Sequence, residues 1–164
     1  TTCPRDLQTE QDVRLVFTVL AESVAARLRD CCMKCRGVQI YLRDNDLQSL
    51  SRQKKMAYPC CTSEPLLQTA MELFRQHYRW QKPLRGISLS AIYLVTANKH
   101  MQLSLFDNTA EQLLLQEQIE KTVDGLRRRF GHDAVLRASA LLDPKLTGFN
   151  PKEDHTIHPY NYFR

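Results

Sequence analysis

Cysteine and histidine side chains form the first group of residues in this sequence that could do chemistry. Six of them stand in close pairs: Cys32 with Cys35, Cys60 with Cys61, and His155 with His158. Thiolates and imidazoles are zinc ligands, so a metal site is one interpretation. However, adjacent cysteines are poor partners for one tetrahedral ion, and the histidine pair lies in a predicted loop, which makes it a weak metal signal. Reduced structural thiols and solvent-exposed histidines are therefore favoured, and we expect no metal and no cofactor.

Carboxylate pairs are the second group, because two-metal phosphoryl transfer needs acidic residues that hold Mg²⁺. The candidates are Asp44 with Asp46, in a polar turn, and Glu153 with Asp154, near the C-terminal end. Neither pair is placed on a regular element that would fix its geometry. The sequence also has no Gly-rich phosphate loop, nucleophile elbow or repeat. We therefore expect no enzyme activity from this chain alone.

Basic residues are concentrated in one part of the chain. The net charge is +5, and residues 47–100 hold eight Lys or Arg against two Asp or Glu, whereas the flanking thirds are nearly balanced. A local basic excess is typical of a surface that binds a polyanion. The alternative is a solvated basic face that only maintains solubility. Arg127, Arg128 and Arg129 fall at the end of a predicted helix, where they stabilise the helix dipole or contact DNA.

Composition places the chain among ordinary globular proteins. It has 164 residues, of which 43% are hydrophobic and 25% are charged. No apolar run approaches the roughly 18 residues of a membrane span, and the first residues lack the pattern of a signal peptide. We expect a cytoplasmic protein with no membrane partner. The chain begins at Thr1 and not at methionine, which suggests a piece of a longer protein.

Hydrophobic periodicity predicts six elements over residues 1–95. A short strand at 1–7 precedes a helix that Thr9 and Asp12 cap, and the alternating stretch at 37–43 begins a hairpin whose second strand is "LQSLSRQKKMAY". A helix starting near Thr62 or Ser63 follows. A last strand, "PLRGISLSAIYLV", has a possible bulge at Gly86 and places Ile87, Leu89, Ala91 and Tyr93 on one side.

The predicted order β-α-β-β-α-β defines an α+β fold. It forms a four-stranded, mostly antiparallel sheet with two helices on one face, which leaves the other face to solvent or a ligand. Beyond it we expect a C-terminal helical extension: a helix from Asn108 or Thr109 to Gly131, then a short strand at 133–139. We expect four segments in all: the domain at 1–97, a linker at 98–107, the extension at 108–142 and an irregular tail at 143–164.

Three stretches, "TTCPRDL", "SLSRQKKM" and "LRGISLS", in this order of elements, resemble the little finger domain of DinB-like Y-family translesion DNA polymerases. The linker sequence "QLSLF" is similar to the peptide with which that family binds the sliding clamp. The resemblance covers residues 1 to about 95 and then 102–106. It implies a region that binds primer-template or other double-stranded DNA, the clamp, and the palm and thumb of its own polymerase, in the bacterial cytoplasm at the nucleoid.

The same resemblance implies which residues contact these partners. DNA phosphates would be held by strand residues, namely Ser51, Arg52, Gln53, Lys54, Lys55, Arg85, Ser88 and Ser90. Strict alternation puts Arg52 and Lys54 on the same side as Leu50 and Met56, so a bulge intervenes or only part of this set faces DNA. The clamp would be bound by the linker residues Gln102, Leu103, Ser104, Leu105 and Phe106. Mg²⁺ would be needed only by the palm of the parent polymerase.

Two alternatives remain open from the sequence. The chain could be a free-standing α+β module whose open sheet binds protein or a second copy. The apolar residues at 103–106 could also pack on the core of this chain rather than on a clamp.

Overall fold

A computed structural model describes residues 2–97 and 109–151. The predicted order of elements is confirmed over the first of these ranges. The elements are β1 (Thr2–Leu7), α1 (Glu10–Asp30), β2 (Met33–Asp44), β3 (Ser49–Cys60), α2 (Ser63–His77) and β4 (Leu84–Thr96). The four strands form one sheet in the order β1-β4-β2-β3, and every neighbouring pair is antiparallel. The α+β fold expected from periodicity is therefore confirmed.

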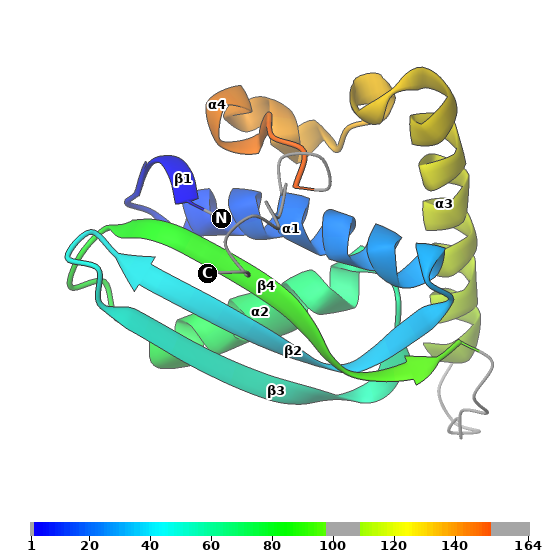
Figure 1. Cartoon of the computed structure of the whole chain (residues 1–164), viewed down its shortest axis with the longest axis horizontal. Helices are drawn as coiled ribbons and strands as arrows, with labels where there is room; N and C mark the ends of the chain where they lie inside the picture. The colour runs from blue at the N-terminus through cyan, green and yellow to red at the C-terminus, as the bar shows by residue number, and fades with distance from the viewer. Residues whose placement is uncertain (1, 98–108, 152–164) are drawn as a thin grey trace, which may run out of the picture.

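Both helices of the domain lie on the same face of the sheet (Figure 1). Helix α1 packs on β4 and β2, while α2 packs on β2 and β3. The interface between helices and sheet is a hydrophobic core that includes Phe17, Phe74, Ile40 and Leu42, each almost fully buried. No helix of the described residues packs on the opposite side of the sheet, which we call the open face.

The start of α1 follows from a reciprocal capping arrangement. The Asp12 amide donates to Thr9 Oγ1 at 3.1 Å, and the Thr9 amide donates to Asp12 Oδ2 at 3.1 Å, as the sequence predicts. Arg5 of β1 adds hydrogen bonds to Asp12 and to Asp143. Two segments far apart in the sequence are thereby fixed to the first turn of α1.

A register shift occurs where β4 begins. Arg43 of β2 pairs with Gly86, but the next residue, Asp44, pairs with Leu84, so Arg85 is the additional residue of a bulge. The bulge expected near Gly86 is thus confirmed.

Beyond the domain, α3 (Thr109–Phe130) is confirmed as a long helix, and Gly131 with φ 97° ends it. It rises at one end of the sheet, next to the C-terminal end of α1 (Figure 1). The strand expected at 133–139 is wrong. This stretch contains two 3-10 helices, η1 (His132–Ala134) and η2 (Ala138–Leu142), and does not join the four-stranded sheet.

The stretch after residue 142 is also more ordered than the sequence suggested. Asp143 accepts hydrogen bonds from the Lys145 and Leu146 amides and starts the short helix α4 (Pro144–Thr147). Leu146 is fully buried, and α4 packs on α1 and β1. Over the described residues 143–151, the expectation of a tail without regular structure is therefore wrong.

Candidate nucleic-acid interface

The face on which each strand residue lies follows from the register of β2 and β3. Ser51, Gln53 and Lys55 pair with Tyr41, Gln39 and Gly37, which alternate with the buried Val38, Ile40 and Leu42. The odd-numbered residues of this hairpin consequently project from the open face. Ser88 and Ser90 of β4 pair with Tyr41 and Gln39 and project from the same face.

Two of the predicted DNA contacts lie on the helix side of the sheet. Arg52 pairs with Ile40 and Lys54 pairs with Val38, both core residues. Lys54 Nζ donates to Glu72 Oε1 of α2 at 2.5 Å, and this hydrogen bond lowers the pKa of Glu72. No bulge moves these two residues across the sheet in this part of β3. The predicted set is therefore divided between the faces, as strict alternation indicated.

Arg85 lies apart from the others, within the bulge at the start of β4. Its Nη1 is 3.9 Å from Asp6 Oδ1 of β1. It is exposed near the turn between β2 and β3, whereas Lys55 lies midway along β3, opposite Gly37.

The hydrogen-bonding side chains of the open face are connected to one another. Gln39 Nε2 donates to Ser51 Oγ at 2.9 Å, and Gln53 Nε2 donates to the Tyr93 hydroxyl at 3.3 Å. Lys55 Nζ lies 5.2 Å from the centroid of the Tyr93 ring. Hydroxyl and amide groups of this kind bind phosphate oxygens without reading base sequence.

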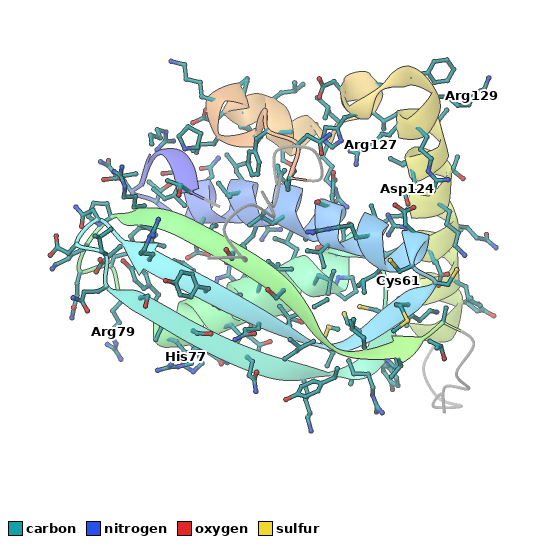
Figure 2. All side chains as sticks on the ribbon, in the orientation of Figure 1. Cys61, His77, Arg79, Asp124, Arg127 and Arg129 are labelled. Carbon is teal, nitrogen blue, oxygen red and sulfur yellow. The ribbon has the colours of Figure 1, made fainter. Side chains whose placement is uncertain are left out.

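The charge carried by strands β2, β3 and β4 is mostly positive. Strands β2, β3 and β4 carry three, three and one Lys or Arg, and Asp44 at the end of β2 is their single acidic residue. Figure 2 shows the side chains that project from the sheet and from the helices. A sheet with this balance attracts a polyanion and repels an acidic surface.

The sequence analysis did not name Tyr41 and Tyr93, two aromatic residues of the open face, as site residues. Tyr41 was predictable, because it alternates with the core residues of β2. Tyr93 was assigned to the side of Ile87 and Leu89, and this is wrong: its φ of 56° breaks the alternation and turns the ring onto the open face above Gly37.

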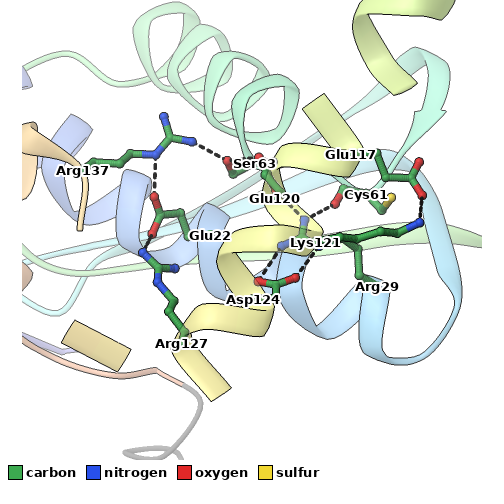
Figure 3. A network of polar contacts seen from close by, with 10 residues as sticks. All are labelled: Glu22, Arg29, Cys61, Ser63, Glu117, Glu120, Lys121, Asp124, Arg127 and Arg137. Carbon is green, nitrogen blue, oxygen red and sulfur yellow. Dashed lines mark hydrogen bonds and ion pairs between the residues drawn. The ribbon is translucent and has the colours of Figure 1, made fainter. Parts of the chain in front are cut away.

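The helix α3 is held by a separate polar network (Figure 3). Arg29 of α1, only 6% exposed, donates to both carboxylate oxygens of Asp124 at 2.7 and 3.0 Å, to Glu120 and to the Cys61 carbonyl at 2.6 Å. Glu120 also accepts from the amide and the hydroxyl of Ser63, and so caps the start of α2. Each of these carboxylates neutralises a cation or a helix end, which indicates a docking role.

Near this network, burial and neighbouring charged groups shift the pKa values of Glu117 and Cys61. Burial opposes charge on Glu117, but hydrogen bonds from Lys121 and Lys34 outweigh it and lower the pKa of Glu117 to about 2. Burial and the negative charge of Glu117 raise the pKa of Cys61 to about 12. Glu117 is therefore a stable anion at neutral pH, and the Cys61 thiol is an unreactive neutral group.

The described residues show neither a disulfide nor a group of side chains that could bind a metal through the cysteines. All six cysteines are free, and among the described side chains no group of three or more His, Cys, Asp or Glu could hold a metal ion. Cys35 and Cys60 pair across β2 and β3, and the Cys35 thiol donates to the Cys60 carbonyl at 3.6 Å; the adjacent Cys35 thiol and burial raise the pKa of Cys60. The two histidines at 155 and 158 lie outside the described residues.

The five predicted clamp-binding residues, Gln102 to Phe106, also lie outside the described residues. They fall between the end of β4 at Thr96 and the start of α3 at Thr109. Of the helices that the structure does describe, none combines the length and the apolar character needed to cross a bilayer.

Known proteins are similar in sequence to this chain over most of its length. Residues 1–105 match the model of the impB/mucB/samB family C-terminal domain. DNA polymerase IV of Acetivibrio thermocellus is 37% identical over 142 residues, which are 87% of this chain and 35% of that protein. DNA polymerase IV of Pelotomaculum thermopropionicum is 33% identical over 140 residues, covering 85% of this chain and 34% of that protein.

More distant relatives carry similar names. DNA polymerase IV 2 of Bacillus subtilis is 28% identical over 146 residues. The chain spans about a third of the length of these curated relatives. The resemblance found in the sequence is thus confirmed at the level of family: the chain belongs to the impB/mucB/samB family of C-terminal domains, the domain type found in Y-family polymerases of the DNA polymerase IV kind.

Proposed function

We propose that this chain is the DNA-binding and clamp-tethering region of a translesion DNA polymerase and that it grips the DNA backbone without sequence specificity. One observation carries the proposal: the face of the sheet that no described helix covers presents the hydroxyl and amide side chains of Ser51, Gln53, Ser88 and Ser90 together with the cation Lys55. The family places such a domain in DNA polymerases, so duplex DNA is the polyanion that the face would take.

Binding would use the open face in two ways. Lys55 and Arg85 each neutralise a phosphate and release a condensed counterion. Ser51, Ser88 and Ser90 donate hydrogen bonds to phosphate oxygens and fix the register of the backbone. None of these contacts distinguishes bases, which suits a protein that must move over any template, damaged or intact.

The tether would be the peptide at 102–106. Leu103, Leu105 and Phe106 would fill an apolar cleft on the sliding clamp, while the Gln102 amide binds a polar subpocket. Burial of three such side chains offers on the order of 5–8 kcal/mol before the cost of ordering the peptide, which corresponds to roughly micromolar affinity.

Nucleotide transfer would belong to the rest of the polymerase. Its palm would hold Mg²⁺, and its palm and thumb would be the intramolecular partners of this domain, at the bacterial nucleoid. Asp44 and Asp46, at the turn between β2 and β3, already have partners within the chain. Asp44 accepts hydrogen bonds from the backbone amides of Asp46 and Gln48, and Asp46 forms an ion pair with Lys82. Incubation of the chain with primed template, Mg²⁺ and nucleotides should give no extension, and extension would refute this assignment.

DNA binding is tested by fluorescence anisotropy with a random-sequence duplex over a series of salt concentrations. Two phosphates neutralised by Lys55 and Arg85 predict a slope of roughly −2 for log K against log salt. A chain that ignores DNA and instead forms a concentration-dependent dimer in ultracentrifugation would favour the interaction-module alternative.

The tether is tested separately by calorimetry with a bacterial sliding clamp. The chain should bind with roughly micromolar affinity, and a variant with Leu105→Ala and Phe106→Ala should not. Loss of folding stability in that variant, without clamp binding by the original chain, would instead place these side chains in the core.

A further inference from the structure

Tyr93 has a backbone conformation that bulky residues rarely adopt. Its φ is 56°, in the left-handed region, and it lies within β4 rather than in a turn. Such conformations persist only where the surroundings impose them, and they concentrate at binding sites. The conformation has a clear result: the ring is turned from the side predicted by alternation onto the open face.

The sheet leaves space for this ring where β2 has a glycine. Beneath it is Gly37 of the central strand β2, where an added Cβ would lie 2.9 Å from Tyr93 Cδ2. Any other residue at position 37 would displace the ring or the strand. The ring therefore rests on bare backbone, and the phenol is fixed at its edge by the hydrogen bond from Gln53.

The ring is nevertheless open to solvent. Tyr93 is 46% exposed, although it is fixed on one side by the strand. Lys55 Nζ lies 5.2 Å from the ring centroid, and no carboxylate of the described residues is within ion-pair distance of this ammonium. A rigid aromatic surface with an unpaired cation beside it is the arrangement that binds single-stranded nucleic acid, in which a base stacks and a phosphate is neutralised.

We propose that Tyr93 is a stacking platform for one unpaired nucleobase of single-stranded DNA, with Lys55 binding the adjoining phosphate. The inference rests on the proposed function and adds to it, because the Gly37 end of the open face, where Lys55 would bind a duplex phosphate, would also take unpaired template nucleotides. Upon binding, Lys55 exchanges its contact with the ring for one with a phosphate. The bases of a duplex are stacked on each other and cannot use the platform.

The alternative role of Tyr93 is to cover Gly37 and nothing more. An apolar side chain would do that as well as a phenol, so the two roles separate in substitutions. Tyr93→Phe keeps the ring and removes only the hydroxyl, whereas Tyr93→Leu keeps an apolar cover and removes the aromatic surface. Tyr93→Phe is thus the matched control for stacking.

The test compares affinities for an oligothymidylate and for a random-sequence duplex, by anisotropy at several salt concentrations. Tyr93→Leu should weaken oligothymidylate binding by roughly 5- to 100-fold, the range for loss of one base–aromatic stack, with an unchanged salt slope. Its duplex affinity should change by less than about twofold, and Tyr93→Phe should behave as the original chain. Equal losses for both DNAs, or no loss for either, would overturn the inference.

A second measurement does not depend on folding of the variants. An oligonucleotide containing 5-iodouracil, irradiated in complex with the unaltered chain, should crosslink to Tyr93, as mapped by mass spectrometry. Adducts confined to other residues would contradict the platform. If the unaltered chain binds neither the oligothymidylate nor the duplex, the proposed function itself is wrong. If it binds the duplex with a steep salt dependence but Tyr93 has no effect, only the stacking proposal is wrong.

Discussion

At the scale of single residues, two neighbouring lysines show how position on a strand decides role. Lys54 and Lys55 have the same chemistry, yet Lys54 pairs with Glu72 of α2 while Lys55 lies beside Tyr93 on the open face. Alternation in the sequence was sufficient to separate them. It was not sufficient for Tyr93, because a positive φ at a bulky residue arises from tertiary contacts and has no local sequence signal.

Gly37 provides a prediction about stability at this scale. Gly37→Ala would place a methyl group 2.9 Å from Tyr93 Cδ2 and 3.0 Å from the Lys54 carbonyl. The free energy of unfolding in urea should fall by about 1–3 kcal/mol because the backbone must shift. The control is Gly125→Ala, in α3, where no atom lies within 4 Å of the added Cβ. This variant should be about 0.5–1 kcal/mol more stable, as helix propensity dictates. Equal effects of the two substitutions would contradict the close approach at Gly37.

At the scale of elements, α3 differs from α1 and α2 in how it is held. The first two helices bury apolar faces, whereas Leu115, Ile119 and Phe130 of α3 are exposed. Its docked side instead presents Glu117, Glu120 and Asp124 to cations of α1 and β2. The sequence predicted the existence and end of α3 from periodicity and Gly131. It could not predict the docking, because ion pairs between residues about 90 positions apart leave no periodic pattern.

Arg29 should dominate this docking. Arg29→Met leaves the carboxylates of Glu120 and Asp124 without their buried partner, and the expected cost is about 3 kcal/mol or more. Hydrogen exchange should show lost protection of α3 amides before that of the sheet. Arg128→Ala is the control: Arg128 pairs with Asp30 but its side chain is 69% exposed, so the loss should stay below about 1 kcal/mol. Undisturbed α3 protection in Arg29→Met would show that the network does not hold the helix.

Glu117 predicts how this docking depends on pH. Its pKa is lowered from 4.5 to about 2 in the folded chain, so it stabilises the fold above its unfolded pKa. That contribution should disappear as pH falls from about 5 through 2. In denaturant titrations, Glu117→Gln should lose about 2 kcal/mol or less at pH 7 and show a weaker decline on acidification. Glu111→Gln, on an exposed part of α3, should follow the unaltered chain. An acid profile of Glu117→Gln identical to that of the original would contradict the account.

At the scale of the whole molecule, the two faces of the sheet have different roles. The helix side supplies the core, and the open side supplies the proposed DNA contacts. The β-α-β-β-α-β order, both hairpin strands and the bulge near Gly86 were predictable because each has a local signal. Helix α4 and the 3-10 helices were not predicted, because elements of three to five residues are too short to show a hydrophobic repeat. The pair Asp143-Pro144 is nevertheless a typical helix start.

The most direct test of the central claim measures duplex binding against salt for Lys55→Gln and Lys54→Gln, beside the unaltered chain. The two variants remove the same charge at adjacent positions on opposite faces of β3. Lys55→Gln should weaken binding and make the slope shallower by about 1, whereas Lys54→Gln should leave both near the original values. Equal effects, or a larger effect of Lys54→Gln, would contradict DNA binding through the open face.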